Sequence, residues 1–239
     1  MLPSFAPDHG FEAAIVDLDG TMVDTLGDFA AALNLMLHDL ALPAIAPERI
    51  ESMVGKGSEH LIASVLRHVL GADGVAPPEA ATRADGLYAA AWAHYQRHYL
   101  AINGQYSRVY PGVVEGLADL RRRGLRLACL TNKPTDFARP LLAAKGLDGY
   151  FDFVFGGDAF ERKKPDPLPL LRTCEALGSP PPRTLMIGDS RNDAQAARGA
   201  GCPVVLVTYG YNHGEPARGV DADAHLDSLA ELSGLLGAR

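Results

Sequence analysis

Short apolar runs recur along the chain, and the first of them ends in two acids. Residues 13–19 have the sequence AAIVDLD, and similar runs follow at 125–131, 151–155, 184–187 and 203–208. Apolar runs of this length, without polar alternation, are typical of strands buried on both faces of a sheet. These five runs are therefore the candidate strands of a buried sheet.

Amphipathic segments lie between the later strands. We expect helices over residues 113–123, 137–145, 167–177 and 193–200, and a glycine follows each of them. Glycine is a common residue just after a helix, because it adopts the left-handed conformation without strain. The repeated order of strand, helix and glycine predicts an α/β fold. Its core would be a doubly wound, Rossmann-like parallel sheet with helices on both faces.

The segment between the first two strands breaks this alternation. It contains helical patterns such as FAAALNLMLHDL, SEHLIASVLRHVL and ADGLYAAAWAHYQRHYL, and no convincing strand. A crossover between parallel strands needs only about a dozen residues, so an excess of this size indicates an inserted helical subdomain. We predict a discontinuous α/β core of residues 1–23 and 107–239, and a helical cap of residues 24–106. Residues 72–82 look like a loop inside the cap.

The composition is that of a globular protein. Of the 239 residues, 47% are hydrophobic and 21% are charged, and the formal net charge is −7. This acidic balance argues against nucleic acid as a partner, because DNA binding depends on lysine and arginine. No apolar run is long enough to span a membrane, and the first residues do not resemble a signal peptide. Three widely spaced cysteines, Cys129, Cys174 and Cys202, favour reduced thiols and a cytoplasmic location.

Polar residues gather where the predicted strands end. In an open α/β sheet, ligands bind outside the carboxyl ends of the strands. Four loops bring acids, a hydroxyl and a lysine to that edge: Asp17, Asp19, Thr131, Lys164, Asp189 and Asp193. Asp17 and Asp19 are two residues apart, so we expect both side chains on one face. A cation would relieve their repulsion, and an all-oxygen site completed by Asp189 is typical of Mg²⁺. With hydroxyl and ammonium donors beside the metal, the pattern indicates phosphoryl transfer.

Four motifs carry a resemblance to a known family. They are DLDGTMVDT at 17–25, LTNK at 130–133, KKPDP at 163–167 and GDSRND at 188–193. In order and spacing they are similar to the motifs of the haloacid dehalogenase superfamily of phosphatases. The insert resembles the helical cap of those members in which the cap follows the first motif. The segments TNKPTDFARPLL, GGDAFERKKPDPLPLL and GDSRNDAQAARGAGCPVVLVTYGYNHGE further resemble a bacterial subgroup that hydrolyses 2-phosphoglycolate.

The resemblance implies a role for each matching position. Asp17 corresponds to the nucleophile that becomes an aspartyl-phosphate. Asp19 corresponds to the general acid and base, and its backbone carbonyl would also ligate Mg²⁺. Asp189 corresponds to a metal ligand, and Asp193 would ligate the metal through water or orient the catalytic lysine. The positions expected to hold the phosphate group are Gly20, Thr21, Thr131, Asn132 and Lys164.

Several of these residues also have a simpler interpretation. Asp193 suits the capping of a helix start, and Lys163 is an adjacent rival for the role of Lys164. We expect Lys133 to be a surface lysine or a residue at the mouth of the site. In the cap, Lys56 lies between two glycines just before a predicted helix start, where an anion can bind. It would contact a substrate carboxylate there, and a solvent-exposed lysine is the alternative.

The expected function is that of a Mg²⁺-dependent phosphatase for a small-molecule phosphate ester, with 2-phosphoglycolate as the leading substrate. A sugar-phosphate mutase would use the same chemistry but return the phosphoryl group to its substrate. A haloacid dehalogenase would need neither Asp19 nor a metal, so the presence of Asp19 argues against it. A binding module without catalysis is disfavoured by the complete set of acids. The sequence leaves open whether the chain is a monomer or a homodimer.

Overall fold

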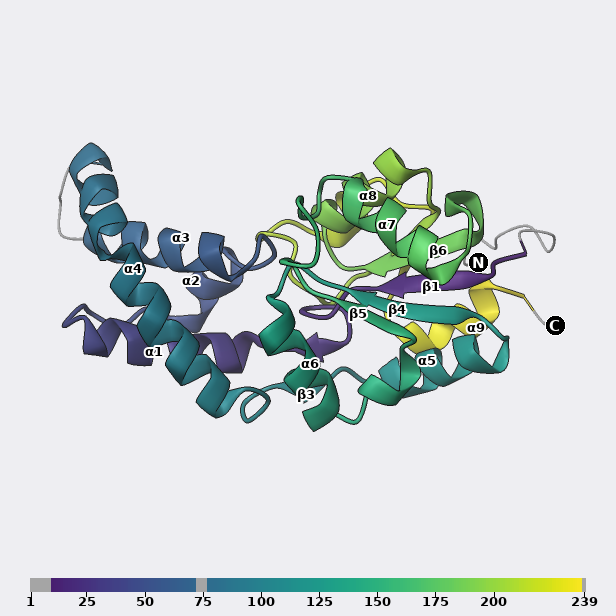
Figure 1. The fold of residues 1–239 in the computed structure, drawn as a ribbon, viewed down its shortest axis with the longest axis horizontal. Coiled ribbons are helices and arrows are strands. Elements are labelled where there is room, and N and C mark those ends of the chain that lie inside the picture. The colour runs from purple at the N-terminus through teal and green to yellow at the C-terminus, as the bar shows by residue number, and fades with distance from the viewer. Residues whose placement is uncertain (1–9, 72–76, 238–239) are drawn as a thin grey trace.

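The computed structural model of the protein describes residues 10–71 and 77–237. A six-stranded parallel sheet has the order β5-β4-β1-β6-β7-β8. It lies in the right-hand part of the molecule in Figure 1. Its strands are β1 (Ala13–Val16), β4 (Arg126–Leu130), β5 (Phe153–Phe155), β6 (Thr184–Gly188), β7 (Val204–Val207) and β8 (Ala224–Leu226). The predicted α/β fold is confirmed, and all five predicted strands are present.

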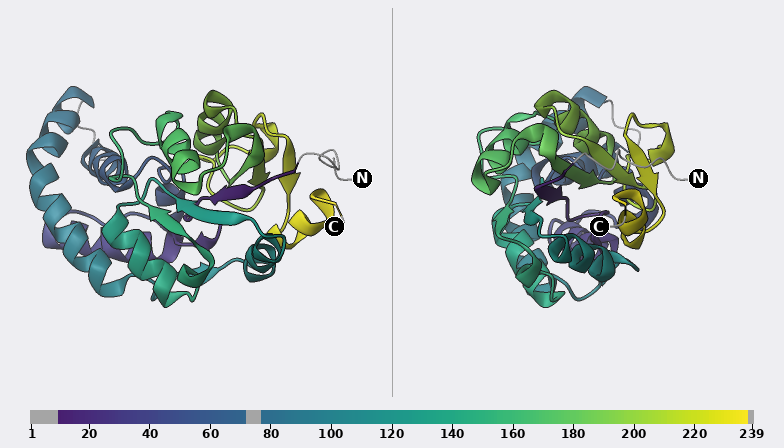
Figure 2. Two further views of the ribbon diagram at one scale, coloured as in Figure 1. Left: turned by 45° about the vertical axis from the view of Figure 1, so that its right-hand side comes forward. Right: turned by 90° about the vertical axis from the view of Figure 1, so that its right-hand side faces the viewer.

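Helices cover both faces of this sheet (Figure 2). One face carries α5 (Val113–Arg122), α6 (Thr135–Ala144) and α9 (Leu232–Leu235), and the other carries α7 (Leu168–Leu177) and α8 (Arg191–Ala200). Strand β1 shows why: Ala14 and Val16 pack in the first layer, and Ala13 and Ile15 pack in the second. All four side chains are fully buried. An unbroken apolar run is what a strand covered on both faces requires.

A helical insert follows β1 and extends beyond one end of the sheet (Figure 1). It contains α1 (Leu26–Asp39), α2 (Pro47–Glu51), α3 (Ser58–Gly71) and α4 (Pro77–Ile102). An antiparallel pair of short strands, β2 (Val23–Asp24) and β3 (Arg108–Val109), joins the entry and the exit of the insert. The insert has its own apolar cluster, in which Tyr95 and Tyr99 are fully buried.

The structure departs from the expected elements in two respects. The strands β2, β3 and β8 are not predicted, because two or three residues carry too little hydrophobic pattern to be recognised. The loop expected at 72–82 is wrong for residues 77–82, which form the start of α4; residues 72–76 lie outside the described residues. Proline in the first turn of a helix is well tolerated, because the amide it lacks would have no partner within the helix.

The expectations about membranes and cysteines can also be compared with the structure. Within residues 10–71 and 77–237, every helix is too short or too polar to cross a lipid bilayer. The three cysteines are buried and free, and the sulfur atoms of Cys174 and Cys202 lie 3.8 Å apart. The thiols therefore belong to the packed core of the sheet and its helices.

Candidate active site

The carboxyl ends of the adjacent strands β4, β1 and β6 bring the predicted site residues together. Asp17 follows β1, Thr131 follows β4 and Asp189 follows β6. Lys164 reaches the same place from the loop before α7, and Asp193 lies in the first turn of α8. All five residues are buried. Chain segments far apart in the sequence therefore meet at one edge of the sheet.

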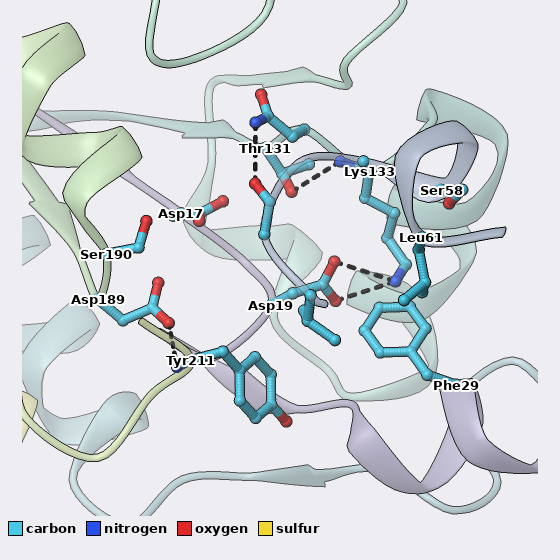
Figure 3. A pocket seen from close by; sticks show the side chains of 14 residues that line it. Asp17, Asp19, Phe29, Ser58, Leu61, Thr131, Lys133, Asp189, Ser190 and Tyr211 are labelled. Atoms are coloured by element: carbon cyan, nitrogen blue, oxygen red, sulfur yellow. Dashed lines mark hydrogen bonds and ion pairs between the residues drawn. The ribbon is translucent and has the colours of Figure 1, made fainter. Parts of the chain in front are cut away.

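A cavity lies between this edge and the insert. Figure 3 shows Asp17 and Asp189 on one side of it, Lys133 and Phe29 on the other, and Asp19 between them. Both parts of the chain line it: Asp17, Asp19, Thr131, Asn132, Lys133, Asp189, Ser190 and Tyr211 from the core, and Phe29, Val54, Gly55, Gly57, Ser58 and Leu61 from the insert. The insert therefore covers the predicted site and forms part of its wall.

Lys164 is a buried cation that contacts Asp17 at one end of this cavity without lining it. Its Nζ lies 2.6 Å from Asp193 Oδ1 and 3.0 Å from Asp17 Oδ1, and it donates to a backbone carbonyl at 2.8 Å. Burial disfavours the charged ammonium, but the two carboxylates outweigh this effect and raise the pKa of Lys164. Its rival Lys163 instead pairs with Glu59 of the insert at 2.7 Å. Of the two lysines, Lys164 is the one inside the site.

Three carboxylates form a candidate cation site. One oxygen from each of Asp17, Asp189 and Asp193 lies within 4.8 Å of the other two. Burial raises the pKa of Asp17 to about 7, against the opposing effect of Lys164. Burial, followed by the charges of Asp193 and Asp17, raises the pKa of Asp189 well above its ordinary value. A divalent cation would relieve both penalties, and oxygen donors suit Mg²⁺. The donor set therefore fits the predicted metal.

Asp193 also stabilises the start of α8. Its Oδ2 accepts the backbone N–H of Ser190 at 3.1 Å, which is its part of a capping box. The Ser190 hydroxyl donates to the same oxygen at 2.7 Å. Its Oδ1 accepts from Lys164 Nζ at 2.6 Å. The side chains of Asp17 and Asp189 line the cavity and that of Asp193 does not, so Asp17 and Asp189 are the better candidates for direct metal contact. Asp193 both caps the helix and orients Lys164, which are two of the interpretations that the sequence left open.

Asp19 lies apart from the carboxylate group, although we expected it beside Asp17. Its two oxygens accept from Lys133 Nζ at 2.9 and 3.1 Å. The expectation of a surface lysine is wrong, because only 1% of the Lys133 side chain is exposed. Lys133 lines the cavity, with its ammonium over the rings of Phe29 and Tyr99 from the insert. No local pattern predicts this burial, since the covering rings come from distant helices.

The residues after β4 connect the site to the insert. The Thr131 hydroxyl accepts a backbone N–H two residues along the chain at 3.2 Å. The Asn132 side chain accepts from the backbone N–H of Lys164 at 3.0 Å and donates to its carbonyl at 2.8 Å. The Nδ2 atoms of Asn132 and Asn192 also lie 3.1 and 3.0 Å from the carbonyl oxygen of Gly55. Two core amides therefore donate to one carbonyl of the insert.

Gly20 and Thr21 pack against Asp189. The Thr21 hydroxyl donates to Asp189 Oδ1 at 3.1 Å. Gly20 has a φ of +81°, and a Cβ atom there would lie 2.2 Å from Asp189 Oδ2. No side chain fits between the first motif and this carboxylate, so glycine is required. These two predicted phosphate positions therefore also fix the orientation of a candidate metal ligand.

Tyr211 is a site residue that sequence reasoning missed. Its backbone N–H donates to Asp189 Oδ2 at 2.5 Å. Its hydroxyl accepts the backbone N–H groups of Thr25 and Leu26, at 2.9 and 3.0 Å, where α1 begins. Its ring packs with the apolar cluster of the insert. Tyr211 thus connects a candidate metal ligand to the start of the insert; a lone tyrosine after a strand carries no sequence signal for such a role.

Lys56 is placed differently from the other predicted residues. It is exposed, and the described residues that line the cavity include its neighbours Gly55, Gly57 and Ser58 but not Lys56 itself. The loop before α3 therefore faces the site, as the sequence suggested, through backbone and small side chains. A contact between Lys56 and a substrate stays a prediction.

The comparison with protein families agrees with this geometry. The family model that describes haloacid dehalogenase-like hydrolases matches residues 11–201. The chain belongs to this family. A relative from Thiobacillus denitrificans, named phosphoglycolate phosphatase, is 45% identical over 222 residues, which cover 93% of this chain and 94% of the relative. The family predicted from the four motifs is therefore confirmed, and so is the prediction of an enzyme.

Solved structures of similar proteins share the fold. A crystal structure from Haemophilus somnus, described as a predicted phosphoglycolate phosphatase, has a TM-score of 0.85 and 32% identity, and covers 93% of this chain and 96% of its own. CbbY from Rhodobacter sphaeroides, solved in complex with phosphate, has a TM-score of 0.75 and 28% identity, with coverage of 94% and 99%. The similarity to both structures extends over the insert as well as the core.

Proposed function

We propose that this hydrolase is a Mg²⁺-dependent phosphomonoesterase that converts 2-phosphoglycolate to glycolate and phosphate. The observation that carries the proposal is the placement of Asp17, buried in the cavity with its carboxylate beside both Lys164 and Asp189. A carboxylate held in this way can attack phosphorus while Lys164 on one side, and a cation held by Asp189 on the other, would offset negative charge. The name of the Thiobacillus relative supports the choice of substrate.

In the proposed reaction, a carboxylate oxygen of Asp17 attacks phosphorus and the bond to the ester oxygen breaks. Asp19 gives a proton to the leaving oxygen, and Asp17 is left as an aspartyl-phosphate. Water then attacks phosphorus, gives its proton to Asp19, and releases phosphate and the free Asp17 carboxylate. The position of Asp19 between the two ends of the cavity is consistent with contact to the ester oxygen (Figure 3).

The other residues hold the reacting groups. Mg²⁺, when bound, would neutralise charge on the phosphoryl oxygens, and Asp17 and Asp189 would hold it. Thr131 would donate to a remaining phosphoryl oxygen, and the Lys164 ammonium beside Asp17 would hold the phosphoryl group through its positive charge. Asn132 keeps the Lys164 loop in position through its two hydrogen bonds to the backbone of Lys164. The insert acts as a cap that excludes water during the first step.

The test is a measurement of kcat/KM for phosphate release in the presence of Mg²⁺, over 2-phosphoglycolate, 2-hydroxyethyl phosphate and several sugar phosphates. We expect 2-phosphoglycolate to have the highest value and EDTA to abolish the reaction. A mutase would convert a sugar phosphate without net phosphate release and would need a bisphosphate activator. A dehalogenase would release halide from a haloacid in the presence of EDTA. The proposal would be contradicted if the purified protein with Mg²⁺ released phosphate from none of these esters.

A further inference from the structure

The end of the cavity away from the candidate metal site is built around Lys133. Among the described residues that line the cavity, Lys133 is the only cation, against the three acids Asp17, Asp19 and Asp189. Its ammonium lies 4.3 Å from the ring centre of Phe29 and 4.7 Å from that of Tyr99. The ammonium therefore contacts the Asp19 carboxylate and two aromatic faces. An aromatic face attracts a cation but accepts no strong hydrogen bond.

The hydrogen-bonding capacity of Lys133 is only partly used. An ammonium group has three N–H donors, and the two oxygens of Asp19 can take two of them. A buried ammonium is costly unless its donors are satisfied. Among the described residues, Asp19 supplies the hydrogen bonds of this ammonium, so its third donor is available to an acceptor that enters the cavity.

The wall beside Lys133 favours a negatively charged group. Gly57 and Ser58 line the cavity at the start of α3, a helix of 14 residues. The first backbone N–H groups of a helix carry partial positive charge and have no partner within the helix. An anion at this end would meet this helix start in addition to the Lys133 ammonium.

We propose, on the basis of the function proposed above, that Lys133 binds the carboxylate of 2-phosphoglycolate. The phosphate group would lie at Asp17, and Lys133 would select small phosphate esters that carry a second negative charge. Thr131 at the phosphate end and Lys133 belong to one loop, two residues apart, so a single short segment sets the spacing of the two anion contacts. That arrangement suits a substrate with few atoms between its charged ends.

The sequence placed this role on Lys56 instead. The structure distinguishes the two lysines, because Lys56 is exposed and absent from the cavity wall, whereas Lys133 is buried in it. The two lysines therefore provide a matched pair of substitutions. Lys133→Met and Lys56→Met each remove the charge and keep an unbranched side chain of similar length.

The experiment compares two substrates that differ only at the end facing Lys133. 2-Hydroxyethyl phosphate has the length of 2-phosphoglycolate, with a neutral hydroxymethyl group in place of the carboxylate. The readout is the ratio of kcat/KM for the two substrates, 2-phosphoglycolate over 2-hydroxyethyl phosphate. Taking the ratio cancels any effect that Lys133 exerts on both reactions through Asp19.

We expect a ratio of at least about 10 for the wild type, because a charge-assisted hydrogen bond would be lost with the neutral substrate. Lys133→Met should lower the ratio by about 10-fold or more, Lys133→Arg should restore part of it, and Lys56→Met should leave it within about twofold.

Two results would overturn the proposal: an equal loss of both activities in Lys133→Met, or a fall of the ratio in Lys56→Met alone. If the Lys133→Met variant does not fold, the wild type alone tests the proposal: a kcat/KM ratio near one for the two substrates would overturn it. A wild type that prefers a different ester contradicts the proposed substrate, yet the response of the ratio to Lys133→Met still tests the carboxylate contact.

Discussion

The two ends of the cavity are each built on a lysine that pairs with an aspartate of the first motif, but they are assembled differently. At the end with the candidate metal site, which we call the metal end, Lys164 binds Asp17 and Asp193, and all three belong to the core. At the other end, Lys133 binds Asp19 and is covered by aromatic rings of the insert. The first end is complete without the insert, and the second is not. We infer that the core supplies the chemistry and that the insert supplies the environment that selects the substrate.

The largest effect should come from Asp17→Asn at the metal end. The amide cannot act as the nucleophile, so kcat should fall by about 10⁴-fold or more. The fold should persist, because asparagine has the same shape and its oxygen can still accept the N–H of Leu18, which now lies 2.7 Å from Asp17 Oδ1. Phosphate release and thermal unfolding measure the two effects. Activity of more than about 1% of wild type would rule out Asp17 as the nucleophile.

The two lysines should differ in what they contribute to stability. Lys164→Met leaves Asp17 and Asp193 buried without their shared cation, and should lower the free energy of unfolding by about 3–5 kcal/mol. Lys133→Met leaves one carboxylate, that of Asp19, which is 13% exposed, and should cost about 1–3 kcal/mol. Urea unfolding without added metal measures both. Equal losses, or a larger loss for Lys133→Met, would contradict the difference between the two ends.

The dependence on Mg²⁺ should also separate the two ends. Asp189→Asn removes a candidate metal ligand, so the Mg²⁺ concentration that gives half-maximal activity should rise by at least about tenfold. Asp19→Asn should lower kcat with little change in that concentration, because the Asp19 carboxylate lies on the side of Lys133. Titration of activity with Mg²⁺ after removal of bound metal measures both variants. A similar shift for the two variants would place the Asp19 carboxylate at the metal.

The same contrast explains what the sequence could predict. Asp17, Thr131 and Asp189 each follow a strand with a clear apolar pattern, and parallel strands place their carboxyl ends at one edge. Their convergence therefore follows from topology and was predicted correctly. The burial of Lys133 and the two contacts of Tyr211 depend on how helices of the insert lie against the core, which no local spacing encodes. The prediction of a loop at 72–82 is wrong for residues 77–82 for a local reason. Prolines usually mark loops, but here they begin α4.

A smaller effect should follow from weakening the contact between the insert and the core. The Gly55 carbonyl accepts from both Asn132 and Asn192. Asn192→Ala removes one of these two hydrogen bonds, which are each worth about 0.5–1.5 kcal/mol. If closure of the insert completes the substrate site, KM for 2-phosphoglycolate should rise by about 2- to 10-fold, while kcat changes little.

The matched control for this contact is Lys163→Met, which also removes a bond between the core and the insert. Its partner Glu59 is exposed, with 47% of its side chain accessible, and exposed ion pairs contribute about 0–1 kcal/mol. KM should therefore change by less than about twofold in this variant. If Lys163→Met raised KM as much as Asn192→Ala, the loss of any bond between the insert and the core would be enough to weaken substrate binding. The Gly55 contact would then have no special part in positioning the wall around Lys133.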